Sequence, residues 1–429
     1  MLIEFSVGNY KSFKQKVTFS MVAANLVSKD KSTDEKNTFA VDEELKLLKS
    51  AAIYGANASG KSNLAKALEF AGWFMVNSSK DTQSTDAIRV EPFKLSTETE
   101  EEPSFFEIIF VLEGRKYRYG FKVTTERVIS EWLYHVPSER EAPLFKRNSD
   151  SISATKVYGA DGIQEKTRHN ALFLSVSAQF NVHIAEKILR WMTENLNVSS
   201  GLSDEGYKTY TFNCLMQGKN KNEILNLIRK LDVGIDDVSV SQIDLTPDSF
   251  PENMPQGLKE LIFKVSAGKG NMVQTKHRKF GKEGKYFSDE MFSLEVQESE
   301  GTQKIFALAA PLVDTLKTGK TLIIDEFDTR LHPLISYEIV RLFNSSITNP
   351  SNAQLIFMTH DTNLLNNRML RRDQIWFTEK DRFGATDLYS LAEYKNVRND
   401  RTYEKDYIKG RYGAIPYIGD LNQSISPHG

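Results

Sequence analysis

The alternation of apolar and polar residues divides the chain into regions of different secondary structure. Near the N-terminus, apolar residues recur at every second position over 2–7 and 16–23, which predicts two strands. A longer stretch, 104–136, is rich in aromatic and β-branched residues and predicts an antiparallel β-meander. Its turns are expected at Glu113-Gly114 and Thr125-Glu126.

In the middle of the chain the apolar spacing lengthens to three or four residues. This spacing predicts helices over 181–196 and 220–231. Short strands are predicted at 238–245, 258–266 and 272–280.

From residue 301 onward, amphipathic helical segments alternate with short apolar strands. Helices are predicted at 301–316 and 333–345, and strands at 321–326, 353–360, 373–380 and 385–394. Such alternation is typical of a layered α/β core built on a parallel sheet. The fold class expected is therefore α/β, a layered core with an antiparallel β-meander and an inserted, mainly helical lobe.

Composition narrows the class of protein without naming its chemistry. A hydrophobic share of 40% and a charged share of 26% are those of a globular chain. A net charge of −2 provides no overall attraction to nucleic acid or to membranes, so any such contact must come from a local patch. The single cysteine, Cys214, cannot form an internal disulfide, which favours a reducing compartment.

The chain offers no signal for secretion or membrane insertion. Its N-terminus has no basic leader followed by a long apolar core. The most apolar later segment, 305–316, carries Asp314 and is too short to cross a bilayer. A cytoplasmic protein without membrane contact is expected.

The strongest chemical signal is the glycine-rich loop from Gly55 to Ser62, which fits the phosphate-loop pattern G-x-x-x-x-G-K-[ST]. A predicted strand precedes it and a predicted helix, 63–70, follows it, so backbone N–H groups and the helix N-terminus converge on one point. Lys61 is expected to reach the β- and γ-phosphates of ATP, and Ser62 to bind Mg²⁺. The residues expected around the phosphates are Gly55, Asn57, Ser59, Gly60, Lys61, Ser62 and Asn63.

Two later strands end in residues that suit the rest of such a site. Asp325 and Glu326 follow one apolar strand; Asp325 is expected to bind Mg²⁺ and Glu326 to act as general base. Thr359 and His360 follow the next strand, and His360 is expected to contact the γ-phosphate.

A fourth element begins at the amphipathic helix near residue 300. Ser299 suits the N-cap of that helix. A serine hydroxyl beside the N–H groups around Gly301 is also an anion site, so the two readings are compatible.

The order of these four motifs resembles that of ABC-type ATPases of the SMC/RecF/OLD-like branch. There they are called Walker A (Gly55–Ser62 here), signature (Ser299–Thr302), Walker B (Asp325–Glu326) and switch histidine (His360). The opening "VGNYKSF" is also similar to the start of SMC and RecF heads. The phrases "ESEGTQ", "DEFDTRLHP" and "DYIKGRYGAIP" resemble stand-alone OLD-like, AAA-type ATPases of bacterial anti-phage operons.

This resemblance implies an ABC-type ATPase head whose halves are residues 1–178 and 291–429, with a lobe at 179–290. It implies a homodimer or larger assembly in which Ser299 and Gly301 of one chain face the ATP held by Lys61 of another. It also implies a sensor or regulator subunit in an anti-phage system, which controls a separate toxin or nuclease. Gln179 is the candidate for a Mg²⁺-sensing glutamine. The alternative is that Gln179 only marks the start of a helix.

Three departures from the family pattern are visible. Glu300 and Thr302 replace the glycine and glutamine of transporter signatures, and His332 stands where SMC heads carry an aspartate. The first two differences concern the contacts of the closed dimer, and the third concerns communication between its two sites.

Rival readings remain open at this point. One is a RecF-like DNA-repair ATPase acting directly on DNA; another is a scaffold that closes on ATP without turnover, against which Glu326 argues. The basic stretch 275–285 fits a solvated hairpin or a contact with DNA or RNA. Residues 368–372 are expected to close a helix end onto sheet carbonyls, and the tail 405–420 either folds back on the head or docks a partner.

Overall fold

In the computed structural model the chain divides into two units. The first comprises 1–202, 315–329 and 336–429, and the second comprises 203–314 and 330–335. The structure describes residues 1–28, 30–137, 140–149, 151–199, 204–231, 234–246, 249–250, 254–395, 397 and 402–417. The domain boundaries expected at 178 and 290 follow a different division and stay a prediction.

The first unit contains the predicted antiparallel meander as part of a seven-stranded sheet. Its order is β10-β9-β8-β7-β6-β1-β2, and every neighbouring pair is antiparallel. The strands are β1 (Leu2–Gly8), β2 (Val17–Ser20), β6 (Ser104–Leu112), β7 (Arg115–Val123), β8 (Val128–His135), β9 (Ala142–Asn148) and β10 (Ser151–Ala154). The predicted turn between β6 and β7 is confirmed, because Glu113 and Gly114 both have positive φ.

A second sheet in this unit has the order β11-β15-β16-β5-β17-β18. Its strands are β5 (Ser50–Gly55), β11 (Leu196–Ser199), β15 (Thr321–Ile324), β16 (Gln354–Met358), β17 (Ile375–Lys380) and β18 (Thr386–Ser390). All neighbours are parallel except β17 and β18, so five strands end at the same sheet edge. The layered α/β core with a parallel sheet, the fold class expected from the sequence, is confirmed.

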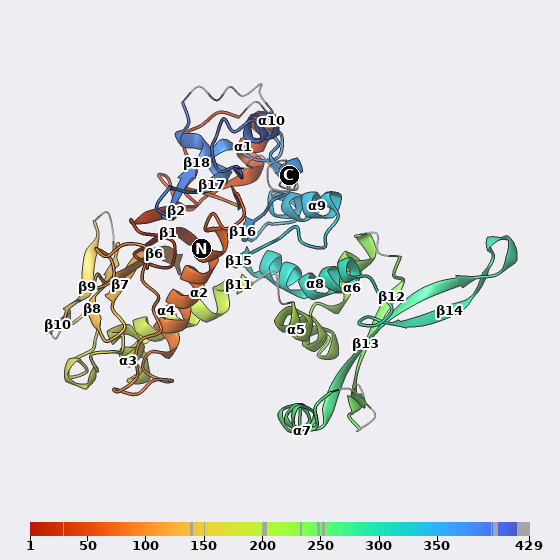
Figure 1. The fold of residues 1–429 in the computed structure, drawn as a ribbon, viewed down its shortest axis with the longest axis horizontal. Coiled ribbons are helices and arrows are strands. Elements are labelled where there is room, and N and C mark those ends of the chain that lie inside the picture. The colour runs from red at the N-terminus through yellow and green to blue at the C-terminus, as the bar shows by residue number, and fades with distance from the viewer. Residues whose placement is uncertain are drawn as a thin grey trace, which may run out of the picture. The chain divides into compact units, whose positions relative to one another are not determined.

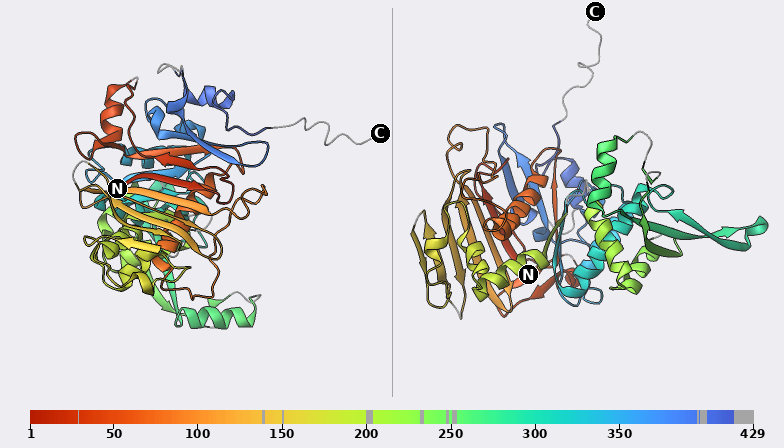
Figure 2. Two further views of the ribbon diagram at one scale, coloured as in Figure 1. Left: turned by 90° about the vertical axis from the view of Figure 1, so that its left-hand side faces the viewer. Right: turned by 90° about the horizontal axis from the view of Figure 1, so that it is seen from below.

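Helix α2 (Lys61–Asn77) lies between the two sheets (Figure 2). It buries Leu64, Leu68 and Phe74 in a cluster that also contains Phe5 of the meander and Ile53 of the parallel sheet. Burying each such side chain contributes about 1.5–3 kcal/mol relative to exposure. The phosphate-loop helix is therefore held from both sides.

The remaining elements of the first unit are short. They are α1 (Lys31–Asn37), β3 (Thr38–Ala40), β4 (Lys46–Leu48), α3 (Phe173–Gln179), α4 (His183–Asn195) and α10 (Tyr403–Ile408). Helix α9 (Pro333–Phe343) begins in the second unit and continues in the first. None of the helices in the described part of the chain has the length and hydropathy needed to cross a bilayer.

The tail after β18 packs onto the parallel sheet. Tyr407 of α10 is buried against Tyr54 of β5, with ring centroids 5.8 Å apart. Tyr412 is buried against Phe377 of β17. Of the two alternatives for this tail, folding back therefore holds for Tyr407 and Tyr412, whereas Tyr417 is exposed. Positions 418–420 of the predicted tail lie outside the described residues.

The second unit combines helices with a three-stranded sheet of order β12-β13-β14 (Figure 1). Its elements are α5 (Glu205–Met216), α6 (Lys221–Lys230), β12 (Asp237–Asp244), α7 (Gln256–Val265), β13 (Lys269–Phe280), β14 (Tyr286–Ser293) and α8 (Glu300–Thr318). Its core joins apolar residues of α5, α6 and α8 with Val238 and Leu294 at the base of the sheet.

Pro311 lies inside α8, where it cannot donate a hydrogen bond to the carbonyl of Ala307. The hydroxyl of Thr211, from α5, donates to that carbonyl instead, at 3.1 Å. The helix therefore continues past its proline because a neighbouring helix satisfies the freed acceptor.

One predicted strand is wrong. Residues 258–266 form most of α7 rather than a strand. Their apolar residues Leu258, Leu261, Ile262 and Val265 are spaced by three, one and three positions, which is the spacing of one helix face. The aromatic and β-branched residues in the segment concealed this period.

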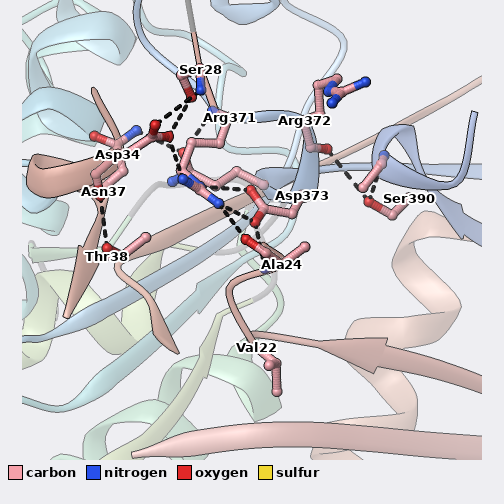
Figure 3. A network of polar contacts seen from close by, with 12 residues as sticks. Val22, Ala24, Ser28, Asp34, Asn37, Thr38, Arg371, Arg372, Asp373 and Ser390 are labelled. Carbon is pink, nitrogen blue, oxygen red and sulfur yellow. Dashed lines mark hydrogen bonds and ion pairs between the residues drawn. The ribbon is translucent and has the colours of Figure 1, made fainter. Parts of the chain in front are cut away.

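A buried charge network ties the N-terminal segment to the turn before β17 (Figure 3). The guanidinium of Arg371 pairs with Asp373 at 2.8 Å and also with Asp34, and it donates to the carbonyl of Ala24. Arg371 and Asp373 are both buried. The expectation that 368–372 closes a helix end is therefore wrong, because Arg371 serves as the centre of this network.

Arg371→Ala should lower the free energy of unfolding by about 3–5 kcal/mol, because it leaves the carboxylate of Asp373 buried without its partner. Denaturant titration measures the change. Arg372→Ala is the matched control, since that half-buried neighbour donates to the carbonyl of Val397 and should cost about 1 kcal/mol. Equal losses in the two variants would contradict the role given to Arg371.

Candidate functional site

The loop between β5 and α2 is closed by hydrogen bonds from the side chain of Lys61 to carbonyls of the loop. The ammonium group of Lys61 is buried and donates to the carbonyls of Gly55 at 2.8 Å and Ala56 at 3.0 Å. A Cβ at Gly55 would lie 2.5 Å from the hydroxyl of Ser59, so only glycine fits there. Gly60 has a φ of 114°, which also requires glycine.

Two threonines and a serine from elsewhere in the unit brace this loop. The hydroxyl of Ser59 lies 2.6 Å from that of Thr378 in β17. The hydroxyl of Thr386, at the start of β18, lies 2.8 Å from both the Ser59 carbonyl and the Ser12 hydroxyl. Asn63 donates to the same Ser12 hydroxyl at 2.7 Å. The sequence reasoning assigned no role to Ser12, Thr378 or Thr386, although Ser12 lies in the quoted opening "VGNYKSF".

Helix α2 presents its N-terminus to this loop. Its N-cap is Gly60, which provides no side-chain hydrogen bond to the first-turn N–H groups. Ser62 in the first turn is half-buried, and Asn57 at the loop tip is exposed. The N–H groups at this helix start, the helix dipole and the Lys61 ammonium together suit a phosphate group.

The acidic pair follows β15 as predicted, although β16 separates β15 from β5, so the carboxylates are not on the strand next to the loop's own. Asp325 is buried, and the following Phe327 is buried with its N–H bonded to the carbonyl of Met358 at 2.9 Å. Glu326 lies between these two anchored residues with a φ of 49°. Left-handed backbone at a non-glycine residue costs on the order of 1–2 kcal/mol and tends to occur at functional sites.

His360 follows β16, the strand between β15 and β5. Its backbone N–H donates to the Asp328 carboxylate at 3.2 Å, and its side chain is exposed at the sheet edge. The preceding Thr359 is buried and bonds through its N–H to the carbonyl of Ile53 in β5. Asp328 was not singled out from the sequence, although it ends the quoted stretch "TLIIDEFD".

The charges at this sheet edge affect the pKa of Lys61 and that of His360. Burial lowers the pKa of the Lys61 ammonium to about 8, against the opposing effect of Asp325, Asp328 and Glu326. Partial desolvation and then the Lys61 charge lower the pKa of His360, against the same three carboxylates. The structure thus brings together Lys61, Asp325, Glu326 and His360, as the sequence predicted, and adds Asp328.

The residues present also fit Mg²⁺. The Ser62 hydroxyl and the Asp325 carboxylate are hard oxygen ligands, which Mg²⁺ prefers together with phosphate oxygens and water. Gln179, the third predicted metal residue, is the exposed last residue of α3. No contact that the structure describes joins Gln179 to Ser62 or Asp325, and its role stays a prediction.

Ser299 and Gly301 lie in the second unit. The hydroxyl of Ser299 accepts from the N–H of Thr302 at 3.1 Å, so Ser299 caps α8. A Cβ at Gly301 would lie 2.9 Å from the carbonyl of Arg330. Ser299 is exposed, which leaves it accessible to another molecule. His332, one of the departures from the family pattern, accepts from the N–H of Leu334 at the start of α9.

Comparison with protein families matches the chain to one model. That model is described as "AAA domain, putative AbiEii toxin, Type IV TA system", and it matches residues 50–192 and 217–366. The match contains the phosphate loop, Ser299, the acidic pair and His360, and extends over more than half of the chain. No curated protein matches the chain significantly.

Several solved structures are similar at low identity. The SMC head domain from Thermotoga maritima is 13% identical, with a TM-score of 0.38, over 91% of this chain and 98% of that one. The Smc head domain from Pyrococcus furiosus bound to the C-terminal domain of ScpA is 15% identical, with a TM-score of 0.39, over 91% and 96%. The recombination mediator RecF with ATP is 14% identical, with a TM-score of 0.33, over 91% and 99%.

The lowered pKa of Lys61 predicts a pH dependence of ATP binding. Anionic phosphates favour the charged ammonium, so binding should draw a proton onto Lys61 above about pH 8, where the free protein has begun to lose it. Affinity should then fall by up to about tenfold per pH unit as pH rises further. Calorimetry in two buffers of different ionisation enthalpy should detect proton uptake at about pH 8.5 and nearly none at pH 7.

Lys66→Ala is the matched control for this experiment, because Lys66 is an exposed lysine of the same helix. It should leave the proton uptake unchanged. Proton release, or no exchange at about pH 8.5 in the unaltered protein, would contradict the assignment of Lys61.

Proposed function

The chain belongs to the family described as "AAA domain, putative AbiEii toxin, Type IV TA system", and from this premise we propose that it binds ATP with Mg²⁺ and hydrolyses it to ADP and phosphate. One observation carries the proposal. The Lys61 loop, the Asp325–Glu326 pair and His360 lie at the carboxyl ends of the adjacent strands β5, β16 and β15, close enough for the two carboxylates to affect the pKa of Lys61 and that of His360.

Each residue has a distinct role in this proposal. Lys61 and the N–H groups of the α2 N-terminus bind the β- and γ-phosphates. Ser62 and Asp325, with Gln179 as a third candidate, would hold Mg²⁺, which would neutralise phosphate charge. Glu326 takes a proton from water as the water oxygen attacks the γ-phosphorus and the bond to ADP breaks.

His360 completes the arrangement. Its lowered pKa favours the neutral imidazole at pH 7, which retains one N–H donor for a γ-phosphate oxygen. Its position is set by Thr359, which is tied to β5, and by Asp328, which accepts from its backbone N–H. His360 is therefore connected to β5 through Thr359 and to the segment after β15 through Asp328.

Lys61→Ala should abolish ATP binding, because Lys61 acts on the phosphates before any reaction. Glu326→Gln should retain binding and slow hydrolysis by roughly 10²–10⁴, because Glu326 acts only on the attacking water. Equilibrium binding and single-turnover assays separate the two effects.

Glu338→Gln, in α9, is the matched control and should have neither effect, because Glu338 pairs with Arg341 and belongs to none of the motifs. Turnover in Glu326→Gln equal to that of the unaltered protein would remove Glu326 from its role.

The active form in this proposal is a homodimer or larger assembly with composite sites. Ser299 and Gly301 of one chain then face the ATP held by the loop of another. Exposure of Ser299 at the N-terminus of the long helix α8 supports this role, since such a terminus attracts anions.

Mixing Ser299→Arg chains with Lys61→Ala chains tests this arrangement. Each variant alone lacks one half of every site, whereas a mixed dimer retains one intact site, so part of the ATPase activity should return. Residual activity that is only the weighted sum of the two variants would contradict shared sites.

The cellular role we assign is a nucleotide-gated sensor or regulator subunit of a bacterial anti-phage system that controls a separate toxin or nuclease. The family description, with its Type IV toxin–antitoxin system, supports such a setting. Four acidic residues after His360 support a separate effector because they have structural partners. Asp373 pairs with Arg371, Glu379 accepts from Tyr389, Asp381 accepts from the N–H of Phe383, and Glu393 accepts from the N–H of Ser390.

Coupling to an effector follows from linkage. A partner that prefers the ATP-bound form is held or released as hydrolysis empties the site, by no more than its difference in affinity for the two forms. Nuclease activity of the purified chain itself, with metal and independent of Glu326, would argue against a separate effector.

A RecF-like or SMC-like ATPase acting directly on DNA is the second candidate. The exposed basic ribbon formed by β13 and β14 is the observation that favours it. ATP turnover stimulated by duplex DNA ends or gaps, and lost steeply with added salt, would distinguish this role from that of a regulator.

A further inference from the structure

The proposed ATP hydrolysis gives no role to the outer part of the β13–β14 ribbon. We call residues 278–287, with the sequence RKFGKEGKYF, the hairpin tip. Every residue of the tip is exposed. Three of them are aromatic: Phe280, Tyr286 and Phe287 are 57%, 59% and 74% exposed.

The tip extends from a base that is anchored in the core of the second unit (Figure 1). Thr275 is buried and bonds to Glu298, and His277 lies 2.6 Å from the same carboxylate. Strand β12 pairs with β13 only up to Lys276, so beyond this point the ribbon has two strands. The tip is therefore held in place by its base and adds no buried side chain to the core.

Solubility alone does not account for this composition. Lysines on exposed strands protect a sheet from pairing with other chains. Aromatic side chains at such a tip have the opposite effect, because an exposed apolar strand invites association. The combination of cations with exposed aromatic rings is instead typical of surfaces that bind single-stranded nucleic acid, where bases stack on the rings and phosphates contact the cations.

The charge of the tip differs from that of the whole chain. It carries four cations, Arg278, Lys279, Lys282 and Lys285, and one carboxylate, Glu283, whereas the chain has a net charge of −2. Such a local excess attracts polyanions, and does so more strongly at low salt.

The tip's ion pairs can exchange for phosphate. Arg278 pairs with Asp236 and Lys279 with Glu290, each at 2.8 Å, and Lys285 lies 3.5 Å from Glu283. Solvent-exposed pairs of this kind contribute little to stability. Lys282, at the turn, has no ion pair within the described residues.

The register of the ribbon places two aromatic residues opposite each other. Phe280 and Tyr286 are cross-strand partners, so they share one face of the ribbon. The pairing shifts between Lys279 and Phe280, which leaves Phe287 as an extra residue between Tyr286 and Ser288. This bulge adds a third aromatic residue directly after Tyr286 in the strand.

From these observations we propose that the hairpin tip binds single-stranded nucleic acid. Bases stack on Phe280, Tyr286 and Phe287, and backbone phosphates contact Lys282 and Lys285. In the proposed regulator this strand is the class of molecule that is sensed, but the binding itself does not require ATP hydrolysis.

Binding of fluorescent single-stranded DNA and RNA oligonucleotides to the full-length protein, followed by anisotropy over a range of salt, tests the proposal. Phe280→Ala with Phe287→Ala should weaken binding between about fivefold and one-hundredfold, by loss of stacking. Lys282→Ala with Lys285→Ala should weaken binding at low salt and reduce the salt slope by about 1.4.

A spectroscopic variant reports contact at the tip directly. The four native tryptophans, Trp73, Trp132, Trp191 and Trp376, all lie in the first unit. Phe287→Trp should add fluorescence that is quenched when an oligonucleotide stacks on it. The same binding by a Lys61→Ala chain separates this proposal from the ATPase, since that variant loses ATP but should retain the oligonucleotide.

Lys380→Ala with Phe383→Ala is the matched control, because it removes an exposed lysine and an exposed phenylalanine near the β17–β18 turn of the first unit. It should leave oligonucleotide binding unchanged. The tip variants should retain ATP binding and thermal stability, which shows that they fold.

Three results would overturn the proposal. They are no binding of single strands by the unaltered protein, equal binding by the tip variants, and a preference for duplex over single strands. A change of oligomeric state in the tip variants with nucleic-acid binding unchanged would instead identify the tip as a contact between copies of this chain. Preference for DNA or for RNA identifies the source of the strand and supports the proposal in either case.

Discussion

The hydrogen bonds from the Lys61 ammonium to the carbonyls of Gly55 and Ala56 are the interaction around which the rest of the site is arranged. They hold a positive charge inside a tightly braced loop, in which Gly55 has no space for a side chain and Ser59 is bound to Thr378 and Thr386. A rigid loop has little conformational freedom to lose when phosphates bind. In exchange, the ammonium is partly desolvated, which is the cause of its lowered pKa.

The carboxylates at the strand ends carry charge opposite to that of Lys61. One of them, Glu326, has a strained backbone. Asp325 is buried at the end of β15 and Phe327 is fixed to β16, so Glu326 between them is left in the left-handed region. The packing on both sides determines this conformation, as is usual where strain persists at functional sites. The backbone of Glu326 is therefore fixed before any substrate is present, which suits a residue proposed to orient and deprotonate water.

The sequence predicted those parts of the fold and site that depend on local pattern. Strands β5, β15 and β16 are each short and apolar and are followed by characteristic residues, and Lys61, Asp325, Glu326 and His360 were singled out from that pattern alone. Helix α7 was mistaken for a strand because its aromatic and β-branched content outweighed the three-and-four spacing of Leu258, Leu261, Ile262 and Val265. Asp328 lies in the same acidic stretch, but no sequence motif assigned it a role.

The brace around the loop could not be predicted, because it joins distant parts of the chain. Ser59 and Thr378 are 319 residues apart, and isolated threonines in strands carry no signal of such a contact. The same holds for Arg371 and Asp34, which are 337 residues apart, and for the position of β16 between β5 and β15. These features follow from the order of strands in the sheet, which a single sequence does not specify locally.

A structure of the protein with a non-hydrolysable ATP analogue and Mg²⁺ tests the central claim most directly. The account predicts that the Lys61 ammonium leaves the carbonyls of Gly55 and Ala56 and binds the β- and γ-phosphate oxygens, with Ser62 and Asp325 at the metal and Glu326 facing the γ-phosphorus. A nucleotide bound elsewhere, or one bound at the loop with Lys61 still on its two carbonyls, would contradict it.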